Sequence, residues 1–459
     1  MKKNDRIELD ITGMTSEGSG VGHAEGMAVF VPLTAVGDRI AAHILKTKKT
    51  YAYAKIDEII TPSADRVAAD CPVFAPCGGC VYRHIKYEAE LRIKQDYVES
   101  CFQRIAKLPL RLCPIVGAEQ TVGYRNKAQL PVREENGEIK IGFFSRHSHR
   151  VVNSAACRLQ PEAFSRVTEA VRDWIKENHI SVYDETAHTG LLRHIFMRAS
   201  KDCRELVLCL VINGAALPHA DALVERCVPL GVTGILLNVN RERTNVILGD
   251  ECQTLYGKPY ITDTLCGREF DISPLSFYQV NRAQAERLYE KAAEYAGCDE
   301  NTVLLDLYCG VGTIGLTMAD KVKQLIGVEI VPQAVEDAAH NAEKNGITNA
   351  RFLCGDAAEA ARQLERENLR PTAVILDPPR KGCDESLIQT VAGMRPERVV
   401  YVSCDPATLA RDYARFAALG YVCPEENGFH CITPFDLFPR TQHVETVCLL
   451  SKLSEASEF

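Results

Sequence analysis

The feature that most constrains the fold is a glycine-rich turn that follows an apolar run. Residues Val303–Tyr308 have the composition of a buried strand, and the turn Cys309–Gly315 follows at once, before a helical stretch. Bare backbone at Gly310 and Gly312 would let a ligand lie against this turn at the carboxyl end of the strand. From about residue 275 onward, strand-like and helix-like segments alternate regularly. The C-terminal part is therefore predicted to be an α/β domain with a doubly wound parallel sheet.

The next strand-like run bears on the kind of ligand that this turn binds. Gln324–Val328 ends in Glu329, which is placed to accept hydrogen bonds from both hydroxyls of a ribose. A Gly-x-Gly-x-x-Gly pattern followed by an acid is also typical of dinucleotide-binding domains. By itself, this pattern does not separate NAD from S-adenosylmethionine.

Acidic residues at other strand ends favour S-adenosylmethionine. Asp306 precedes the turn and suits the cationic amino group of a methionine moiety better than it suits a pyrophosphate. Asp356 follows the third strand-like run and is placed to bond an adenine amino group. The fourth run, Ala373–Leu376, ends in Asp377-Pro378-Pro379-Arg380, a stiff turn suited to holding a planar, amide-bearing base. Methyltransferases that act on nucleobase rings carry such a turn there and dehydrogenases do not, so a methyltransferase is predicted.

Cys404 is the candidate nucleophile among 19 cysteines. The fifth strand-like run, Arg398–Val402, ends in Ser403-Cys404-Asp405-Pro406, directly before a helix. Ligands of open α/β sheets bind at such strand ends, and a helix N-terminus would favour the thiolate. Most of the other cysteines lie in apolar runs and are expected to be core residues.

A thiol suits methylation of a uracil ring. Uracil C5 is a weak nucleophile, but addition of Cys404 to C6 makes an enolate whose C5 can take a methyl group. A base must then remove the C5 proton. Glu445, at the start of the last strand-like run, is the candidate, with His443 as the rival. A stacked base cannot reach such a pocket, so the target must be single-stranded or flipped out.

The N-terminal part has the pattern of a small RNA-binding barrel. Four or five short strand-like runs with glycine-rich turns over about 60 residues predict an oligonucleotide-binding β-barrel over residues 1–62. Basic residues interleave with aromatic ones there, as RNA binding requires: Lys46, Lys48, Lys49, Lys55, Tyr51 and Tyr53. The whole chain has a net charge of −8, but basic residues outnumber acidic ones over residues 41–150.

The middle of the chain, residues 63–270, is predicted to be a mixed α+β domain. A helix is expected over about 87–107, where it would pack on the catalytic domain of residues 271–459. Strands are expected at Gln129–Val132, Ile139–Phe144, Leu206–Ile212 and Val246–Gly249. This part also holds Cys71, Cys77 and Cys80 on one tight loop, and from spacing alone zinc and an iron–sulfur cluster are both possible ligands for them.

In combination, these motifs closely resemble those of the RNA uracil-C5 methyltransferases, specifically the 23S ribosomal RNA branch. The resemblance covers nearly the whole chain and rests on the segments Ser276–Asn281, Asp306–Gly312, Asp377–Arg380, Ser403–Pro406 and His443–Glu445. It also covers an N-terminal TRAM barrel, through Gly20-Val21-Gly22 and Val29–Pro32.

The resemblance implies roles for individual residues. It implies a class I, Rossmann-like methyltransferase domain with Cys404 as nucleophile and Glu445 as general base. It further implies that the cofactor is contacted by Gln279, Tyr308, Glu329 and Asp377. The positions of Gly310 and Asp356 at strand ends add these two residues to the predicted cofactor site. Thr313 replaces a common asparagine in the glycine turn, so that contact is not carried over.

The resemblance also favours an iron–sulfur cluster over zinc as the ligand of these cysteines. It implies a [4Fe–4S] cluster held by Cys71, Cys77, Cys80 and Cys157, with a structural or RNA-contacting role. The neighbouring RNA-contacting surface would include Tyr124–Lys127 and Arg193-His194.

The expected partner is RNA, with 23S ribosomal RNA as the predicted target and transfer RNA as the alternative. A non-catalytic RNA-binding module is opposed by the Cys404 and Glu445 pair, and a dehydrogenase by the Asp-Pro-Pro turn. No run approaches the length of about 18 apolar residues that a membrane span needs, and Met1–Asp5 lacks the apolar core of a signal peptide. We therefore expect a cytoplasmic monomer with no membrane partner.

Overall fold

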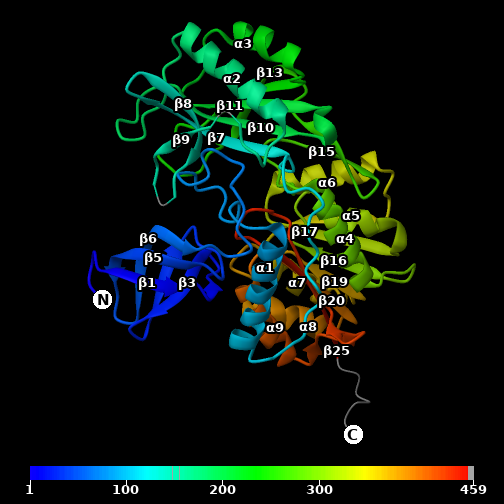
Figure 1. Cartoon of the computed structure of the whole chain (residues 1–459). Coiled ribbons are helices and arrows are strands. Elements are labelled where there is room, and N and C mark those ends of the chain that lie inside the picture. The colour runs from blue at the N-terminus through cyan, green and yellow to red at the C-terminus, as the bar shows by residue number, and fades with distance from the viewer. Residues whose placement is uncertain (147, 155, 453–459) are drawn as a thin grey trace. The chain divides into compact units, whose positions relative to one another are not determined.

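The computed structural model describes residues 1–146, 148–154 and 156–452. The chain divides into two compact units. The first comprises Met1–Tyr97 with the short segments Phe143–Val152 and Phe438–His443, and the second comprises Val98–Gly142, Asn153–Leu437 and the C-terminal segment from Val444. Figure 1 shows the elements of both.

The first unit contains a six-stranded sheet coiled around one apolar core. Its strands are β1 (Arg6–Asp10), β2 (Gly13–Met14), β3 (Ser19–Ala24), β4 (Met27–Pro32), β5 (Arg39–Thr47) and β6 (Tyr51–Thr61), in the order β1-β5-β6-β4-β3-β2. Alternate residues of the strands, such as Val29 and Val31, point into the core, as period-two patterns require. Gly22 lies so close to β1 that an added Cβ would meet a side-chain carbon of Leu9 at 2.3 Å. The predicted small β-domain is therefore present.

A seven-stranded sheet, most of which belongs to the second unit, follows along the chain. Its strands are β7 (Lys127–Glu135), β8 (Glu138–Phe144), β9 (Val151–Asn153), β10 (Leu192–Ala199), β11 (Leu206–Ile212), β12 (Gly234–Val239) and β13 (Glu251–Gly257), in the order β13-β12-β11-β10-β7-β8-β9. Helices α2 (Glu162–Glu177) and α3 (Ala220–Cys227) pack against each other beside it (Figure 1). The hairpin of β14 (Ile261–Leu265) and β15 (Arg268–Ile272) follows.

The prediction of a strand at Val246–Gly249 is wrong. Val246–Gly249 is a loop, because side chains on β12 and just after it take the backbone groups that a strand would pair. Asn240 Nδ2 donates to Val246 O at 2.8 Å, and Asn238 Nδ2 donates to Gly249 O at 2.7 Å. The buried side-chain amides of Asn238 and Asn240 thus bond the backbone carbonyls of this loop, which replaces the backbone pairing that a strand would make.

The C-terminal sheet has eight strands, and its first five run parallel. They are β16 (Val303–Leu307), β17 (Gln324–Glu329), β18 (Ala350–Cys354), β19 (Ala373–Leu376) and β20 (Arg398–Ser403). The long strand β25 (Glu445–Lys452) pairs antiparallel with β20, giving the order β18-β17-β16-β19-β20-β25-β21, and β24 (Ile432–Phe435) pairs with β25. The short strand β21 (Tyr421–Val422) pairs with β25 and completes this sheet. The strands β22 (Glu425–Glu426) and β23 (Phe429–His430) pair with each other as a separate two-stranded sheet.

Helices cover both faces of this sheet, as the alternation predicted. Helices α4 (Arg282–Ala296), α5 (Thr313–Met318) and α6 (Pro332–Lys344) form one layer, and α7 (Ala357–Arg366), α8 (Glu385–Met394) and α9 (Pro406–Ala417) form the other (Figure 1). The Rossmann-like α/β architecture is confirmed. The inner strands β16, β17, β19 and β20 are almost wholly buried, which is why they read as unbroken apolar runs.

The helix predicted over about 87–107 is α1 (Tyr87–Cys101), and it continues as a π-helical turn, Phe102–Ala106. The Phe102 ring packs edge-on against Tyr413 of α9, with centroids 5.6 Å apart. The π-helical turn at the end of this helix thus packs against α9. Among the described residues, no helix is both long and apolar enough to span a membrane.

Candidate active site

The predicted site residues lie at one edge of the C-terminal sheet. Tyr308, Glu329 and Asp377 each end or directly follow a parallel strand, and Cys404 follows β20. Because the carboxyl ends of parallel strands meet at one edge, the fold brings these four residues together.

The glycine turn is built around Asp306. Its Oδ2 accepts a hydrogen bond from Gly315 N at 2.9 Å, and a Cβ at Gly315 would meet that oxygen at 2.8 Å, so glycine is needed there. Its Oδ1 is buried and has no hydrogen-bond partner among the described residues. Burial, together with the carboxylates of Asp377 and Glu329, raises the pKa of Asp306 to about 7.

This arrangement fits a cationic ligand. Three carboxyl groups repel one another at one strand edge, and an unpartnered carboxyl oxygen is left for a donor. A sulfonium or ammonium group would relieve that repulsion, and a pyrophosphate would increase it. The residues present therefore fit S-adenosylmethionine better than a dinucleotide.

The backbone of the turn leaves room for such a ligand. Tyr308 and Gly310 have φ angles of 66° and 54°, in the left-handed region. A Cβ at Gly310 would meet nothing within 4 Å. Glu329 Oε2 accepts from Gly310 N at 3.1 Å, and Glu329 Oε1 accepts from the backbone N–H groups of the two residues that follow it. These bonds fix the Glu329 carboxylate beside the open turn.

Two further predicted cofactor residues also have structural roles. Asp356 caps α7, because its Oδ1 accepts from the N–H groups of Ala358 and Glu359 at 2.9 and 3.2 Å. Gln279 is buried, and its backbone carbonyl accepts a hydrogen bond from Asn126 Nδ2 at 2.9 Å. At the position that departs from the family pattern, Thr313 Oγ1 lies 3.1 Å from the Tyr289 hydroxyl.

Cys404 and Glu445 face each other across two antiparallel strands. Ser403 of β20 pairs with Thr446 of β25. The residue after Ser403 and the residue before Thr446 therefore lie opposite each other, and these are Cys404 and Glu445. Glu445 is 5 % exposed, whereas Cys404 is only half-buried.

The surroundings of Cys404 do not favour the thiolate, contrary to the prediction. Burial, Glu445 and Asp377 raise the pKa of Cys404 to about 11, and the opposing effect of Arg380 is smaller. The N-terminus of α9 is already satisfied by Asp405, whose Oδ1 accepts from two N–H groups of its first turn. Burial and the charge of Asp377 likewise raise the pKa of Glu445 to about 8.

Arg380 is a charged member of this site to which the sequence argument gave no role. It acts on both Cys404 and Glu445 electrostatically. The sequence did hold a sign of this role, because Arg380 ends the Asp-Pro-Pro-Arg turn whose Asp377 was predicted to lie at the site. His443, the rival base, belongs to the first compact unit, whereas Glu445 belongs to the second.

The predicted metal ligands are not gathered as a metal site. Within the described residues, no three Cys, His, Asp or Glu side chains are close enough together to hold a metal ion. Cys71, Cys77 and Cys80 lie in the first unit and Cys157 in the second. The loop is nevertheless well anchored, since Gly78 N donates to Phe144 O at 3.1 Å and Arg146 donates to Cys80 O at 2.8 Å.

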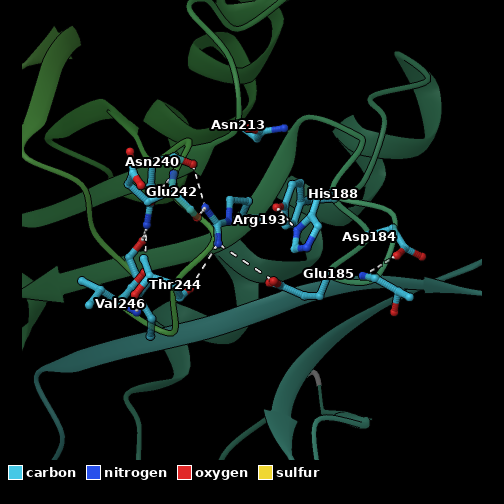
Figure 2. A network of polar contacts seen from close by, with 12 residues as sticks. Asp184, Glu185, His188, Arg193, Asn213, Asn240, Glu242, Thr244 and Val246 are labelled. Atoms are coloured by element: carbon cyan, nitrogen blue, oxygen red, sulfur yellow. Dashed lines mark hydrogen bonds and ion pairs between the residues drawn. The ribbon is translucent and has the colours of Figure 1, made fainter.

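Arg193 and His194 are not part of an exposed RNA surface, contrary to the prediction. Figure 2 shows the Arg193 guanidinium inside a polar network, where it donates to Asn240 O at 2.8 Å and to Glu242 O at 2.9 Å. The two side chains are 1 % and 5 % exposed. Burial, with Arg133 and Arg193 nearby, lowers the pKa of His194 to about 3. Arg193 holds the loop after β12, and His194 is buried within β10 of the central sheet.

Comparisons with known proteins show which families the chain resembles. Residues 255–453 match the tRNA (uracil-5-)-methyltransferase family, and residues 2–56 match the TRAM domain. An uncharacterized RNA methyltransferase of Halalkalibacterium halodurans is 42 % identical over 98 % of both chains, and one of Clostridium tetani is 39 % identical over 98 % of this chain and 97 % of its own.

A solved structure also matches over nearly the whole chain. It is the Pyrococcus abyssi tRNA (uracil-54, C5)-methyltransferase in complex with S-adenosyl-L-homocysteine. The TM-score is 0.77 at 27 % identity, and the match covers 97 % of this chain and all of that one.

Proposed function

The chain belongs to the RNA (uracil-5-)-methyltransferase family, and from this premise we propose that Cys404 and Glu445 methylate C5 of a uridine in RNA by covalent catalysis. The observation that supports the proposal most is the half-buried thiol opposite a buried carboxyl at the strand edge. Methyl transfer from S-adenosylmethionine is the activity of the family.

Cys404 opens the reaction in this mechanism. Its thiolate adds to uracil C6, forming a C–S bond, and the C5–C6 π electrons move onto O4 as an enolate. Enolate C5 is then nucleophilic enough to take the electrophilic methyl group that the sulfonium of S-adenosylmethionine supplies. C5 now carries both the methyl group and its original proton.

Glu445 completes the reaction. Its carboxylate removes the C5 proton, the electrons re-form the C5–C6 double bond, and the Cys404 thiolate leaves C6. Burial suits this base, because the raised pKa makes its carboxylate a stronger proton acceptor. Arg380 would stabilise the negative charge of the Cys404 thiolate and of the Glu445 carboxylate.

The cofactor contacts are part of the proposal. Asp306 would pair with the amino group of the methionine moiety, Glu329 with the ribose, and Asp356 with the adenine. Gln279, Tyr308 and Asp377 would line the space between cofactor and uracil, over the bare backbone of Gly310. The crowding of carboxyls around Asp306 supports this assignment, since it selects for a cation.

The rate should rise with pH. Cys404 and Glu445 must both lose a proton to act, and their pKa values are raised to about 11 and about 8. Below about pH 8 both groups are largely protonated, so kcat/KM should climb between pH 6 and 8 and rise less steeply once Glu445 is ionised. Release of tritium from RNA carrying [5-³H]uridine measures this rate. A profile that is flat or falls over this range would contradict the assignment.

Tritium release also tests the reaction itself. Methylation at C5 must displace one C5 hydrogen for each methyl group gained, so tritium released and methyl incorporated should match one to one. Methyl incorporation with no tritium release would place the methyl group on another atom, and the proposal would fail.

We propose 23S ribosomal RNA as the target, and transfer RNA is the alternative that the Pyrococcus abyssi enzyme favours. The ribosomal target rests on the TRAM domain and the cysteine loop together. The barrel has the groups that single-stranded RNA needs: Phe30, Tyr51 and Tyr53 have ring centroids 5.5 to 5.8 Å apart and none is buried. Exposed lysines Lys46, Lys48, Lys49 and Lys55 flank them.

An iron–sulfur cluster on Cys71, Cys77, Cys80 and Cys157 remains a proposal that rests on the family resemblance. Protein purified without oxygen should contain about four iron atoms and four sulfides per chain. Cys77→Ser should lose the iron. One zinc per chain and no sulfide would support the alternative metal, and absence of both would remove the metal centre from the account.

A further inference from the structure

A buried carboxylate in α9 bonds the turn that follows the Asp-Pro-Pro sequence. Asp412 is 0 % exposed. Its Oδ2 accepts hydrogen bonds from Cys383 N and from the Tyr401 hydroxyl, both at 2.8 Å. Its Oδ1 accepts from Arg411 Nε at 2.9 Å and from Arg415 Nη1 at 3.1 Å. Each carboxylate oxygen therefore has two donors, and the reaction described above uses none of these groups.

The bonded turn packs directly against this carboxylate. Gly382 N donates to Pro379 O at 2.8 Å, and the φ angle of Gly382 is 75°, in the left-handed region. A Cβ at Gly382 would overlap Asp412 Oδ2, so glycine is needed there. Arg411 Nη2 donates to Lys381 O at 2.8 Å. The backbone of the turn is thus both bonded to α9 and packed against it.

The same helix holds two parts of the site. Helix α9 begins two residues after Cys404, and Asp412 lies in its second turn. The turn that Asp412 bonds carries Arg380. Burial raises the pKa of Cys404 and of Glu445, and the positive charge of Arg380 opposes this rise. Because the Arg380 side chain is exposed, the backbone of its turn determines where that charge lies.

A buried carboxylate is a costly way to attach a turn to a helix. Removing a charge from water costs free energy, which its partners must offset, and apolar packing would attach the turn at a lower cost. Hydrogen bonds to a carboxylate, however, have preferred distances and angles. Four such bonds to Asp412 therefore suit a role in fixing the position of the turn.

We propose that Asp412 is a positioning residue that holds the turn of Arg380 so that its guanidinium stabilises the Cys404 thiolate and the Glu445 carboxylate. The inference deepens the proposed function and rests on it, because it assigns Asp412 to the same reaction. Without the Asp412 bonds the turn can shift, and the charge of Arg380 moves away from the thiol. The kcat should therefore fall, while KM for S-adenosylmethionine stays close to its wild-type value.

The reactivity of Cys404 tests this role without RNA or cofactor. The rate at which iodoacetamide alkylates Cys404, followed by mass spectrometry of its peptide, reports the thiolate fraction. Asp412→Asn keeps the shape of the side chain but turns an N–H donor toward groups that are themselves donors. Cys404 in this variant should react about threefold more slowly than in the wild type, because less of it is thiolate. A variant that had only loosened the fold would expose the thiol and speed its alkylation.

A double variant tests whether Asp412 acts through Arg380. Arg380→Gln alone should slow the alkylation of Cys404 and the turnover of RNA at least as much as Asp412→Asn does. Arg380→Gln/Asp412→Asn should then match Arg380→Gln in both measurements, because the charge to be positioned is already absent. Effects that multiply in the double variant would overturn the proposal.

Two further variants address the stability of the fold. Tyr401→Phe removes one of the four donors with little change of shape, so it should slow alkylation in the same direction, and it keeps the test available if Asp412→Asn does not fold. Asp299→Asn removes a carboxylate that accepts from Asn301 N at 3.0 Å and from Thr302 Oγ1 at 2.8 Å, just before β16. This position lies at the other end of the parallel strands, so kcat and Cys404 alkylation should match the wild type.

Failure of this proposal differs from failure of the proposed function. If the wild type methylates uridine in RNA but Cys404 reacts equally fast in the wild type, Asp412→Asn and Tyr401→Phe, Asp412 has no positioning role and the methyltransferase assignment stands. If the wild type methylates no RNA, the proposed function fails, and the inference that rests on it falls with it.

Discussion

Replacing Cys404 with alanine is expected to reduce methyl transfer at least about 1,000-fold while leaving RNA and cofactor binding nearly unchanged. The alanine cannot add to C6, so uracil C5 stays too weak a nucleophile to react. The half-buried position of Cys404 tolerates the smaller side chain, and loss of activity should therefore not reflect unfolding. Incorporation of labelled methyl groups into RNA measures the effect.

A fluorinated substrate makes this prediction specific to Cys404. With 5-fluorouridine RNA and S-adenosylmethionine, the reaction should stop after methyl transfer, since fluorine cannot leave as a proton does. The wild type should then form an RNA–protein adduct that survives denaturation, and Cys404→Ala should form none. Cys298→Ala, at another half-buried cysteine, should behave as the wild type. An adduct on Cys404→Ala would show that another residue is the nucleophile.

Replacing Glu445 with glutamine should block the last step instead of the first. Glutamine has nearly the same shape but cannot accept the C5 proton, so turnover should fall by about 100- to 10,000-fold. The thiol can still add and the methyl group can still be transferred. Ordinary uridine RNA should therefore accumulate as a covalent, methylated adduct, which denaturing gel electrophoresis would detect.

This variant distinguishes a base from a structural carboxyl. Glu445 is buried next to Asp377, so a neutral glutamine removes repulsion and should not destabilise the fold. Glu425→Gln, on an exposed strand, should turn over normally. If Glu445→Gln loses turnover without accumulating an adduct, proton removal belongs to another group, and His443 becomes the next residue to test.

The architecture of the C-terminal domain could be predicted because its strands are buried on both faces. Runs such as Val303–Leu307 and Ala373–Leu376 are apolar at almost every position, and turns rich in glycine or proline mark where they end. The parallel order then brings the strand ends together, which is why residues far apart in sequence were expected at one site. Glu445 could be placed because it opens the last strand.

Charge balance inside the site could not be predicted in the same way. Cys404 precedes a helix, which favours a thiolate, but Asp405 caps that helix and two carboxyls face the thiol. Their combined effect depends on side-chain burial and distance, which the sequence does not encode locally. For the same reason Arg193 and His194 were expected on the surface, although the first holds a loop through buried carbonyl contacts.

The central claim is that this chain methylates C5 of a uridine in RNA through Cys404. The most direct measurement maps 5-methyluridine in ribosomal and transfer RNA from cells with the gene, without it, and with only the Cys404→Ala form. We expect one or more 5-methyluridines to vanish on deletion, to return with the wild-type gene, and to stay absent with Cys404→Ala. Unchanged maps of both RNAs after deletion would contradict the account, and full restoration by Cys404→Ala would contradict its mechanism.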